Sequence, residues 1–156
     1  IAFIAGPPTY RSSRERRIGF SHALERRGLN LDPALILEGA YSFESGIECG
    51  ALLCRRVPRP TAIFTSNDEM AAGVYRAARA QGLNIPDDIS IIGYDDSPLA
   101  TRIWPSLTTV RVPIPDMGKL AAERLLARQR GAVRLEAVEI VPALVVRESV
   151  RRIAGR

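Results

Sequence analysis

Residues 61–95 read TAIFTSNDEMAAGVYRAARAQGLNIPDDISIIGYD. An apolar run at 61–65 is followed by Ser66 and Asn67, either of which suits the N-cap of an amphipathic helix. After that helix comes a second apolar run at 89–94. Short, continuously apolar strands separated by a helix are typical of a parallel sheet that is covered on both faces. The stretch therefore predicts a β–α–β unit with both strands inside the molecule.

The same alternation extends toward the N-terminus. Apolar runs at 1–5 and 35–37 are each followed by a helical pattern, expected over about 12–27 and 43–56. The expected strands begin about 30 residues apart, which is the length of a βα unit. Right-handed crossovers then place helices on both faces of the sheet. We therefore predict an α/β fold built on an open, doubly wound parallel sheet.

Beyond the fourth expected strand the pattern changes. After a turn and a short helical piece, residues 107–112 are expected to be extended and 116–130 to form an amphipathic helix. A last apolar run at 138–146 is interrupted by Pro142. A proline inside a strand is tolerated at an edge or at a crossing between subdomains, so the last strand is expected in such a place.

The composition describes an ordinary globular protein. The chain has 156 residues, 46% hydrophobic and 25% charged, which excludes a predominantly disordered chain. No apolar run approaches the roughly 18 residues that a membrane helix needs, so we expect no membrane partner. The chain starts at Ile1 without a methionine, and we therefore expect it to be part of a longer protein.

The net charge of +5 raises the question of nucleic-acid binding. The arginines are scattered in ones and twos, and basic pairs along helices usually form solvated faces. No zinc-finger, helix-turn-helix or RNA-recognition signature is present. We therefore expect no nucleic-acid contact through these residues.

The sequence gives little support to catalytic or metal chemistry. Cys49 and Cys54 stand five residues apart on an expected helix, where they point about 140° apart and suit neither a disulfide nor a shared metal. His22 is the only histidine. No nucleophile elbow, phosphate-binding loop or dinucleotide fingerprint occurs. The sequence therefore predicts no enzyme activity, no metal and no cofactor.

Four polar or aromatic residues mark one expected edge of the sheet. In an open parallel sheet, ligands bind beyond the carboxyl ends of the strands. Tyr41, Asn67 and Asp95 each follow or end an expected strand, and Arg16 lies on the first helix near the same edge. Carboxylate and guanidinium groups bind paired hydroxyls, an amide donates or accepts, and an aromatic ring stacks on an apolar face. The set suits a polyhydroxylated or planar polar ligand.

Each of these residues also has a plainer interpretation. Arg16 shares a helix face with Phe20 and would be satisfied by an internal ion pair, for example with Asp95. Asn67 would serve only as a helix cap, and Asp95 only as a turn residue. Tyr41 would be an ordinary surface residue. The convergence of all four on one edge favours a ligand site.

Three longer motifs surround this edge. They are NDEMAAG at 67–73, IPDDISIIGYDD at 85–96 and PSLTTV at 105–110. Together they resemble the LacI/GalR family of bacterial transcription regulators, and the stretches 6–20 and 117–126 look like the same family. The first motif also occurs in periplasmic sugar-binding proteins, whereas the second and third are more typical of the regulators.

The resemblance implies a periplasmic-binding-protein-like domain of type I, in which two α/β subdomains clamp a small ligand. Residues 1–110 are then expected to be the C-terminal subdomain without its first βα unit, and 111–138 a segment of the N-terminal subdomain. Residues 139–150 would return to the C-terminal subdomain, and 151–156 would be a tail. Most of the N-terminal subdomain and a helix-turn-helix headpiece are expected to lie outside this chain.

The resemblance also assigns the ligand contacts by motif position. They fall on Arg16, Tyr41, Asn67 and Asp95, with Tyr41 as the stacking ring. A second apolar wall falls on Ile114, where relatives often carry an aromatic residue. The aliphatic side chain at this position leaves the class of ligand open, although a sugar is the main expectation.

Family members dimerise through this domain and bind operator DNA through the headpiece. The expected dimer surfaces are the helices that follow Phe43 and Asn67, together with the segment 99–103. The implied partners are a small-molecule effector, a second copy of the chain, and operator DNA through the headpiece only. The resemblance implies no cofactor.

Two functions remain open at this level. One is the effector-sensing and dimerising part of a cytoplasmic transcription regulator, in which ligand shifts the balance between two subdomain arrangements. The other is a periplasmic sugar-binding protein of a transport system. A helix-turn-helix encoded upstream would support the first, and a signal peptide would support the second. We expect the first, because the motifs at 85–96 and 105–110 are typical of the regulators.

Overall fold

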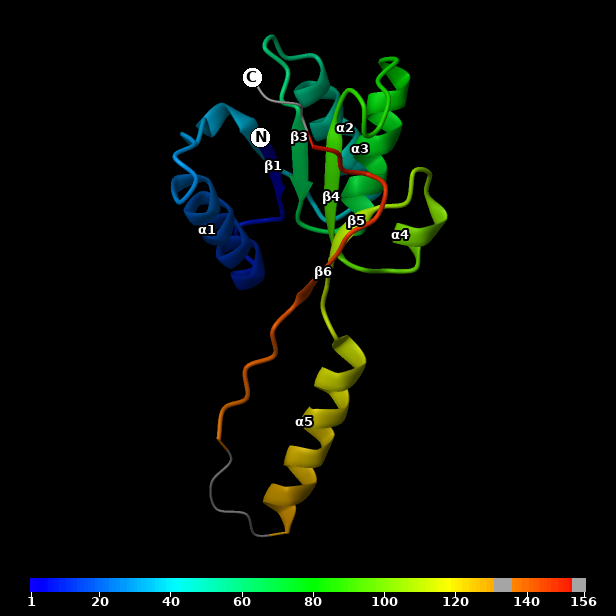
Figure 1. Ribbon diagram of the computed structural model, residues 1–156. Coiled ribbons are helices and arrows are strands. Elements are labelled where there is room, and N and C mark those ends of the chain that lie inside the picture. The colour runs from blue at the N-terminus through cyan, green and yellow to red at the C-terminus, as the bar shows by residue number, and fades with distance from the viewer. Residues whose placement is uncertain (131–135, 153–156) are drawn as a thin grey trace.

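The computed structural model describes residues 1–130 and 136–152, and these form a six-stranded sheet with the strand order β2–β1–β3–β4–β5–β6 (Figure 1). The strands are β1 (Ala2–Ala5), β2 (Ile36–Glu38), β3 (Ala62–Thr65), β4 (Ser90–Asp95), β5 (Thr108–Arg111) and β6 (Ala143–Val145). Strands β1 to β5 pair in parallel, and β6 pairs antiparallel with β5. The predicted open α/β sheet is confirmed, with one antiparallel strand added. Residues 131–135 of the segment expected to cross between subdomains, and 153–156 of the expected tail, lie outside the described residues.

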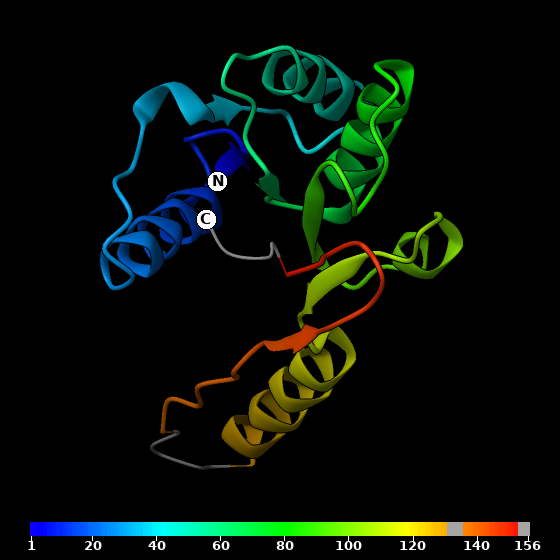
Figure 2. The same cartoon turned by 45° about the horizontal axis from the view of Figure 1, so that its top comes forward.

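Helices cover both faces of the sheet. They are α1 (Arg11–Glu25), α2 (Phe43–Cys54), α3 (Asp68–Ala80), α4 (Leu99–Arg102) and α5 (Ile114–Gln129), with a 3₁₀ turn at Pro33–Leu35. Helix α1 lies on one face, and α2 and α3 lie side by side on the other (Figures 1 and 2). The chain moves outward from β1 to β2 and then in the opposite direction to β3 and β4. The reversal between β1 and β3 is the topological switch point, beside which such sheets bind ligands.

Two glycines allow α2 and α3 to pack with their backbones almost in contact. A Cβ atom at Gly46 would overlap the backbone of Met70, and one at Gly73 would overlap the backbone of Phe43. Met70 and Val74 are fully buried against this contact and the sheet. The close pair holds α3 against α2, and α3 begins at the edge that carries the expected ligand site.

The last strand is shorter than the apolar run at 138–146 predicts. Only the three residues that follow Pro142 pair with β5. Proline has no N–H to donate to a ladder, which explains why the pairing starts after it, and β6 is an edge strand, where a neighbouring proline is tolerated. Helix α5 conversely begins at Ile114, earlier than expected, because Pro115 is tolerated in the first helical turn.

Helix α5 projects away from the rest of the chain. It follows β5, which is parallel to β4, so it leaves from the edge where the parallel strands end (Figure 1). None of its residues is buried, and the Leu125 side chain is 72% exposed. The expected amphipathic helix is present, but its apolar side is uncovered by the described residues.

The groups considered for metal or redox chemistry are isolated from one another. Cys49 and Cys54 are buried free thiols, as their helical spacing predicts, and burial raises the pKa of both. Within residues 1–130 and 136–152, no three His, Cys, Asp or Glu side chains gather as a metal site. None of the helices described there is both long and apolar enough to cross a membrane.

Candidate ligand-binding site

Four strands end at one edge of the sheet and bring the expected site residues there. Strands β1 to β4 run parallel, so their carboxyl ends share this edge. The loop after β2 carries Tyr41, the residue that caps α3 after β3 is Asn67, and β4 ends with Asp95. Arg16 reaches the edge from α1. The structure therefore brings these four residues to the switch point, as the sequence predicts.

Arg16 joins three segments of this edge. Its Nη1 donates to the Ser66 carbonyl oxygen at 3.0 Å and to the Tyr41 hydroxyl at 3.4 Å. Its guanidinium lies 3.8 Å from the centre of the Tyr94 ring. None of the ion pairs in the described chain joins Arg16 to Asp95, so the internal pair considered above does not form. The guanidinium is oriented by neutral groups and keeps donors for a ligand.

Asn67 uses both ends of its amide. Its Oδ1 accepts from the Met70 backbone N–H at 2.9 Å, which caps α3, and its Nδ2 donates to the Tyr41 carbonyl oxygen at 2.9 Å. Asn67 is therefore a helix cap, as its plainer interpretation predicts, and this role does not use all of its hydrogen-bonding groups. The amide still has one N–H and one lone pair to offer, and it also holds the loop that carries Tyr41.

The Tyr41 ring lies directly over the backbone of Gly6. A Cβ atom at Gly6 would overlap the ring, so this approach requires glycine. Tyr41 has a φ of 61°, a left-handed conformation that aims the side chain back across the edge. Its ring meets that of Tyr10 edge-on, with centroids 5.8 Å apart. Tyr10 is 57% exposed, so the pair forms an accessible aromatic border that the sequence did not single out.

Asp95 presents an exposed carboxylate at the end of β4. The surrounding protein atoms partly withdraw the carboxyl group from water, which raises its pKa to about 6. The Arg16 charge lowers this pKa in part, and the Asp68 charge raises it further. Asp95 has a φ of 113°, which marks a turn held in an uncommon conformation. At neutral pH the carboxylate is ionised and can accept two hydroxyl hydrogens.

Ile114 stands apart from the other four residues. It is the first residue of α5 and is 61% exposed where the helix leaves the edge. The structure thus assembles four of the five expected residues, and it places the fifth on the segment that projects from the same edge.

A buried carboxylate that the sequence analysis passed over supports the turn after β4. Asp68 is 1% exposed and accepts from the Thr109 hydroxyl at 2.6 Å and from the Ser97 backbone N–H at 2.7 Å. A Cβ atom at Gly93 would overlap this carboxylate. Asp68 directly follows Asn67 in the NDEMAAG motif, and this position beside a predicted site residue was the one sign of its importance in the sequence. Its partners are distant in sequence, so the role was visible only in the fold.

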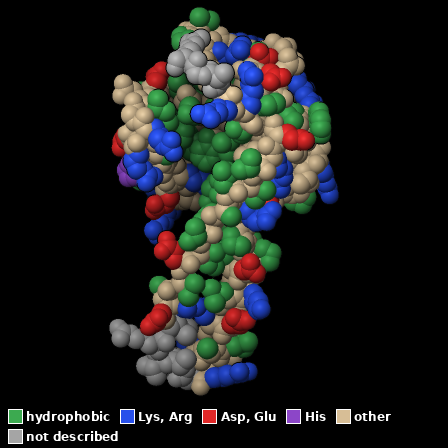
Figure 3. Space-filling model, in the orientation of Figure 1, with side chains coloured by type: hydrophobic (Ala, Val, Ile, Leu, Met, Phe, Trp, Pro, Cys, Tyr) green, Lys and Arg blue, Asp and Glu red, His purple; other side chains and the backbone are tan. Residues whose placement is uncertain are grey.

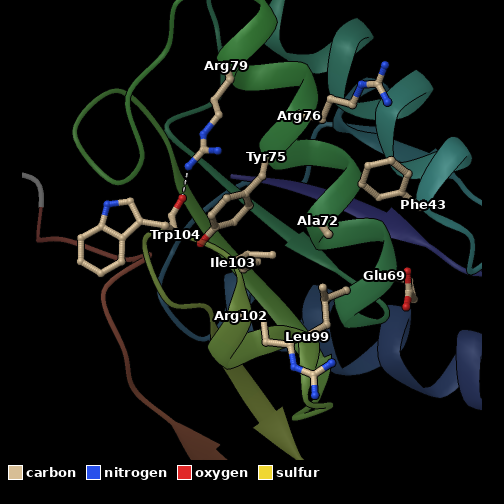
Figure 4. A pocket seen from close by; sticks show the side chains of 10 residues that line it. All are labelled: Phe43, Glu69, Ala72, Tyr75, Arg76, Arg79, Leu99, Arg102, Ile103 and Trp104. Carbon is tan, nitrogen blue, oxygen red and sulfur yellow. Dashed lines mark hydrogen bonds between the residues drawn. The ribbon is translucent and has the colours of Figure 1, made fainter.

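The three segments expected to form the dimer surface meet at a second place. Residues from α2, α3 and α4 line a cavity of about 580 Å³ (Figure 4). Apolar side chains at its floor are flanked by three arginines and one glutamate. The lining residues are Phe43, Glu69, Ala72, Tyr75, Arg76, Arg79, Leu99, Arg102, Ile103 and Trp104. Trp104 is 71% exposed, and its carbonyl oxygen accepts a hydrogen bond from Arg79.

An apolar groove of about 670 Å³ lies on the other face, between α1 and strands β3 and β4. Phe20 and Phe64, stacked with Phe3, form part of its floor, and Arg16 and Tyr94 stand at its ligand-site end. Figure 3 shows apolar side chains gathered in a hollow of this face. Among the described residues, α1 is the one helix that covers this face, and it covers only part of the sheet's width.

Curated relatives of the chain are transcriptional repressors. The HTH-type transcriptional repressor PurR of Haemophilus influenzae is 36% identical over 157 residues, which is 98% of this chain and 47% of that repressor. The ribose operon repressor of Escherichia coli is 37% identical over 150 residues, which is 96% of this chain and 46% of that repressor. The chain spans about half the length of the curated relatives it matches. These relatives are regulators rather than enzymes, as the sequence predicts.

Solved structures show the same fold over 95% or more of the chain. A regulatory protein of the LacI family from Chloroflexus aggregans has a TM-score of 0.90 at 36% identity, covering 96% of this chain and 54% of that one. The regulator CelR in complex with cellobiose has a TM-score of 0.86 at 35% identity, covering 95% of this chain and 46% of that one. The lac repressor dimer bound to operator and an anti-inducer has a TM-score of 0.87 at 32% identity, covering 96% of this chain and 51% of that one.

The fold and the edge site define a domain of the small-molecule-binding kind, and residues 1–150 match the family described as periplasmic binding protein-like domain. Within that class, the chain belongs to the LacI family of transcription regulators. The resemblance stated from the motifs is thereby confirmed.

Proposed function

We propose that the chain is the effector-binding and dimerising part of a cytoplasmic transcription regulator. The observation that carries the proposal is the assembly of Arg16, Tyr41, Asn67 and Asp95 at the switch point of the sheet. The relatives named above are repressors and regulators, which favours this function over transport.

The chemistry of the edge favours a sugar as effector. Arg16 has unused donors and Asp95 an exposed ionised carboxylate, and together these suit adjacent hydroxyl groups. Tyr41, bordered by Tyr10, offers an aromatic face to the apolar side of a sugar ring. The cellobiose complex of CelR gives independent support for a sugar at a domain of this fold.

We propose that residues 111–138 belong to a second, N-terminal subdomain and that 139–150 return from it. The uncovered side of α5 supports this arrangement, because an amphipathic helix is stable when its apolar side is buried. Ile114 would then face the ligand from the second subdomain. The open groove beside α1 is the position for the missing first βα unit of residues 1–110.

We propose that two copies associate through the face formed by α2, α3 and α4. An exposed tryptophan beside a cavity is the kind of anchor that interfaces use. The lac repressor structure, a dimer on its operator, supports both the dimer and the DNA partner. Operator contact is assigned to a headpiece outside residues 1–156, since the arginines of this chain are dispersed.

Ligand would regulate DNA binding by favouring one arrangement of the two subdomains. Arg16 and Asp95 lie on one side of the edge, and α5 leaves from the same edge. A ligand that contacts both sides binds one arrangement more tightly than the other and shifts the population toward it.

Calorimetric titration of the full-length protein with D-ribose and with cellobiose tests the site. We expect one of these sugars to bind the wild type. Arg16→Ala and Asp95→Ala should each weaken that binding by about 100-fold, because each removes charged hydrogen bonds of about 1.5–3 kcal/mol. The matched control is Arg26→Ala, which removes an exposed arginine from the far end of α1. Unchanged affinity in Arg16→Ala and Asp95→Ala would refute the assignment.

A further inference from the structure

Asp96 binds both strands that connect the sheet to α5. Its Oδ2 accepts from Arg111 Nε at 2.5 Å, and its Oδ1 accepts from Arg147 Nη2 at 2.6 Å. Arg111 is the last residue of β5, the strand that leads to α5, and Arg147 lies two residues beyond β6, the strand that returns (Figure 1). Each oxygen of one carboxylate therefore holds one of the two connecting strands.

The half of this contact made by Arg147 is largely withdrawn from water, whereas Arg111 is 56% exposed. The side chains of Asp96 and Arg147 are 8% and 14% exposed. Arg147 also donates from Nη1 to the Leu107 carbonyl oxygen at 2.8 Å, and its backbone N–H donates to the Thr108 hydroxyl at 2.9 Å. Burial raises the pKa of Asp96, but the hydrogen bonds from Arg147 and Arg111 outweigh it and hold the pKa below its usual value. The carboxylate is therefore charged, and charged hydrogen bonds of this kind are the stronger ones.

Asp96 also adjoins the ligand site through a turn with little freedom. Asp95 and Asp96 have φ values of 113° and 56°, which non-glycine residues adopt only where their surroundings enforce them. The Asp96 backbone N–H donates to the Thr109 hydroxyl at 3.4 Å, and the next residue is held by buried Asp68. A shift of Asp95 on ligand binding would therefore carry the Asp96 carboxylate with it.

We propose that Asp96 is a positioning residue that couples the ligand-binding edge to the two connecting strands and so sets the orientation of α5. The inference rests on the proposed effector binding at Asp95 and names the route by which that binding is transmitted. Asp95 is the proposed ligand contact, whereas Asp96, one residue on, binds Arg111 and Arg147. Loss of either arginine contact should loosen the angle between the sheet and α5.

A purely stabilising ion pair would behave differently. It would alter the free energy of unfolding and leave both the position of α5 and the affinity for sugar unchanged. Coupling requires that α5 itself becomes less well positioned when the contact is removed. The distance between α5 and the sheet-bound helix α1 is therefore the decisive quantity.

The experiment measures that distance by double electron–electron resonance in the full-length protein. Nitroxide labels are placed at Glu123→Cys on α5 and at Arg26→Cys, the residue that caps the C-terminus of α1, in the wild-type background and in two variants. Asp96→Asn weakens both contacts. Arg111→Gln removes only the contact of an arginine that is 56% exposed, so it spares the fold if Asp96→Asn does not.

The matched control is Asp87→Asn, which makes the same replacement on a carboxylate that is 71% exposed and lies 3.6 Å from Arg151. We expect a narrow distance distribution in the wild type and the control, and a broad one in Asp96→Asn and Arg111→Gln. In those two variants the affinity for D-ribose or cellobiose, whichever binds, should fall about five- to tenfold, in the range of typical coupling energies.

Distributions in both variants as narrow as in the wild type, at the same mean distance, would overturn the proposal. The distances are measured first without sugar, so they decide the role of Asp96 independently of effector identity. If neither sugar binds the wild type, ribose and cellobiose are excluded as effectors of this protein, while broad ligand-free distributions still support the coupling role.

Discussion

At the scale of single residues, Asp95 shows a conflict between binding and stability. Its carboxyl has a pKa near 6 in the folded chain, against 3.8 as its ordinary value. Between these pH values the folded state holds more protons than the unfolded state, so stability falls as pH rises from about 4 to about 6. The loss persists at neutral pH, where the charged form is needed to bind a ligand.

Asp95→Asn should therefore stabilise the protein at neutral pH, because the amide carries no charge to be withdrawn from water. The gain at pH 7.5 should be less than about 1 kcal/mol, since an exposed group is well screened. It should shrink as pH falls toward 4.5. Urea unfolding midpoints at the two pH values measure the effect, with Asp87→Asn as the control for loss of a surface carboxylate. A gain that is equal at both pH values would contradict this account of Asp95.

The sequence predicted the place of a residue in the fold where that residue adjoins a strand end. Tyr41, Asn67 and Asp95 follow that rule, and the helical position of Arg16 placed it at the same edge. The roles of Tyr10 and Asp96 were not predicted, because their partners are distant in the sequence. Tyr41 lies 31 positions from Tyr10, and Arg111 and Arg147 lie 15 and 51 positions from Asp96. Sequence spacing within a single helix or turn carries no signal for such contacts.

At the scale of elements, the face formed by α2, α3 and α4 is the strongest candidate for self-association. Two-fold related copies present the same patch to each other, so each contributes three arginines and one glutamate around an apolar floor. The excess of arginine implies repulsion between the copies. Added salt should therefore strengthen this dimer by screening it.

Leu99→Arg should convert the full-length dimer largely to monomer at micromolar concentration, because it places a further positive charge on the apolar floor. Val57→Arg is the matched control, since Val57 is 97% exposed in the loop after α2 and outside this face. Sedimentation velocity gives the oligomeric state of each protein. A Leu99→Arg protein that stays dimeric under the conditions used for the control would rule out this face.

Element prediction was most accurate inside the alternating βα pattern. In this pattern, the spacing of the apolar residues and the helix-capping residues, such as Asn67, predict the same elements that the tertiary structure contains. It was least accurate after β5, where Pro115 lies inside a helix and Pro142 shortens a strand. Proline marks a boundary in sequence, but whether the missing N–H matters depends on the neighbouring element.

At the scale of the whole molecule, two apolar surfaces are uncovered by the described residues. One is the groove between α1 and β4, and the other is the side of α5. Both flank the edge that carries Arg16 and Asp95. This pattern agrees with a chain that spans about half the length of its relatives and forms one side of a two-sided ligand site.

The measurement that tests effector binding most directly is a thermal-shift screen of the full-length protein. A panel of pentoses, hexoses, disaccharides and nucleobases is applied in parallel to the wild type and to Asp95→Ala. A ligand at about 100 times its Kd stabilises the folded state by about 2.7 kcal/mol. We predict that at least one sugar raises the wild-type midpoint by several degrees and leaves Asp95→Ala unchanged. A panel in which no sugar shifts the wild type, or in which the variant shifts equally, would contradict a sugar site at this edge.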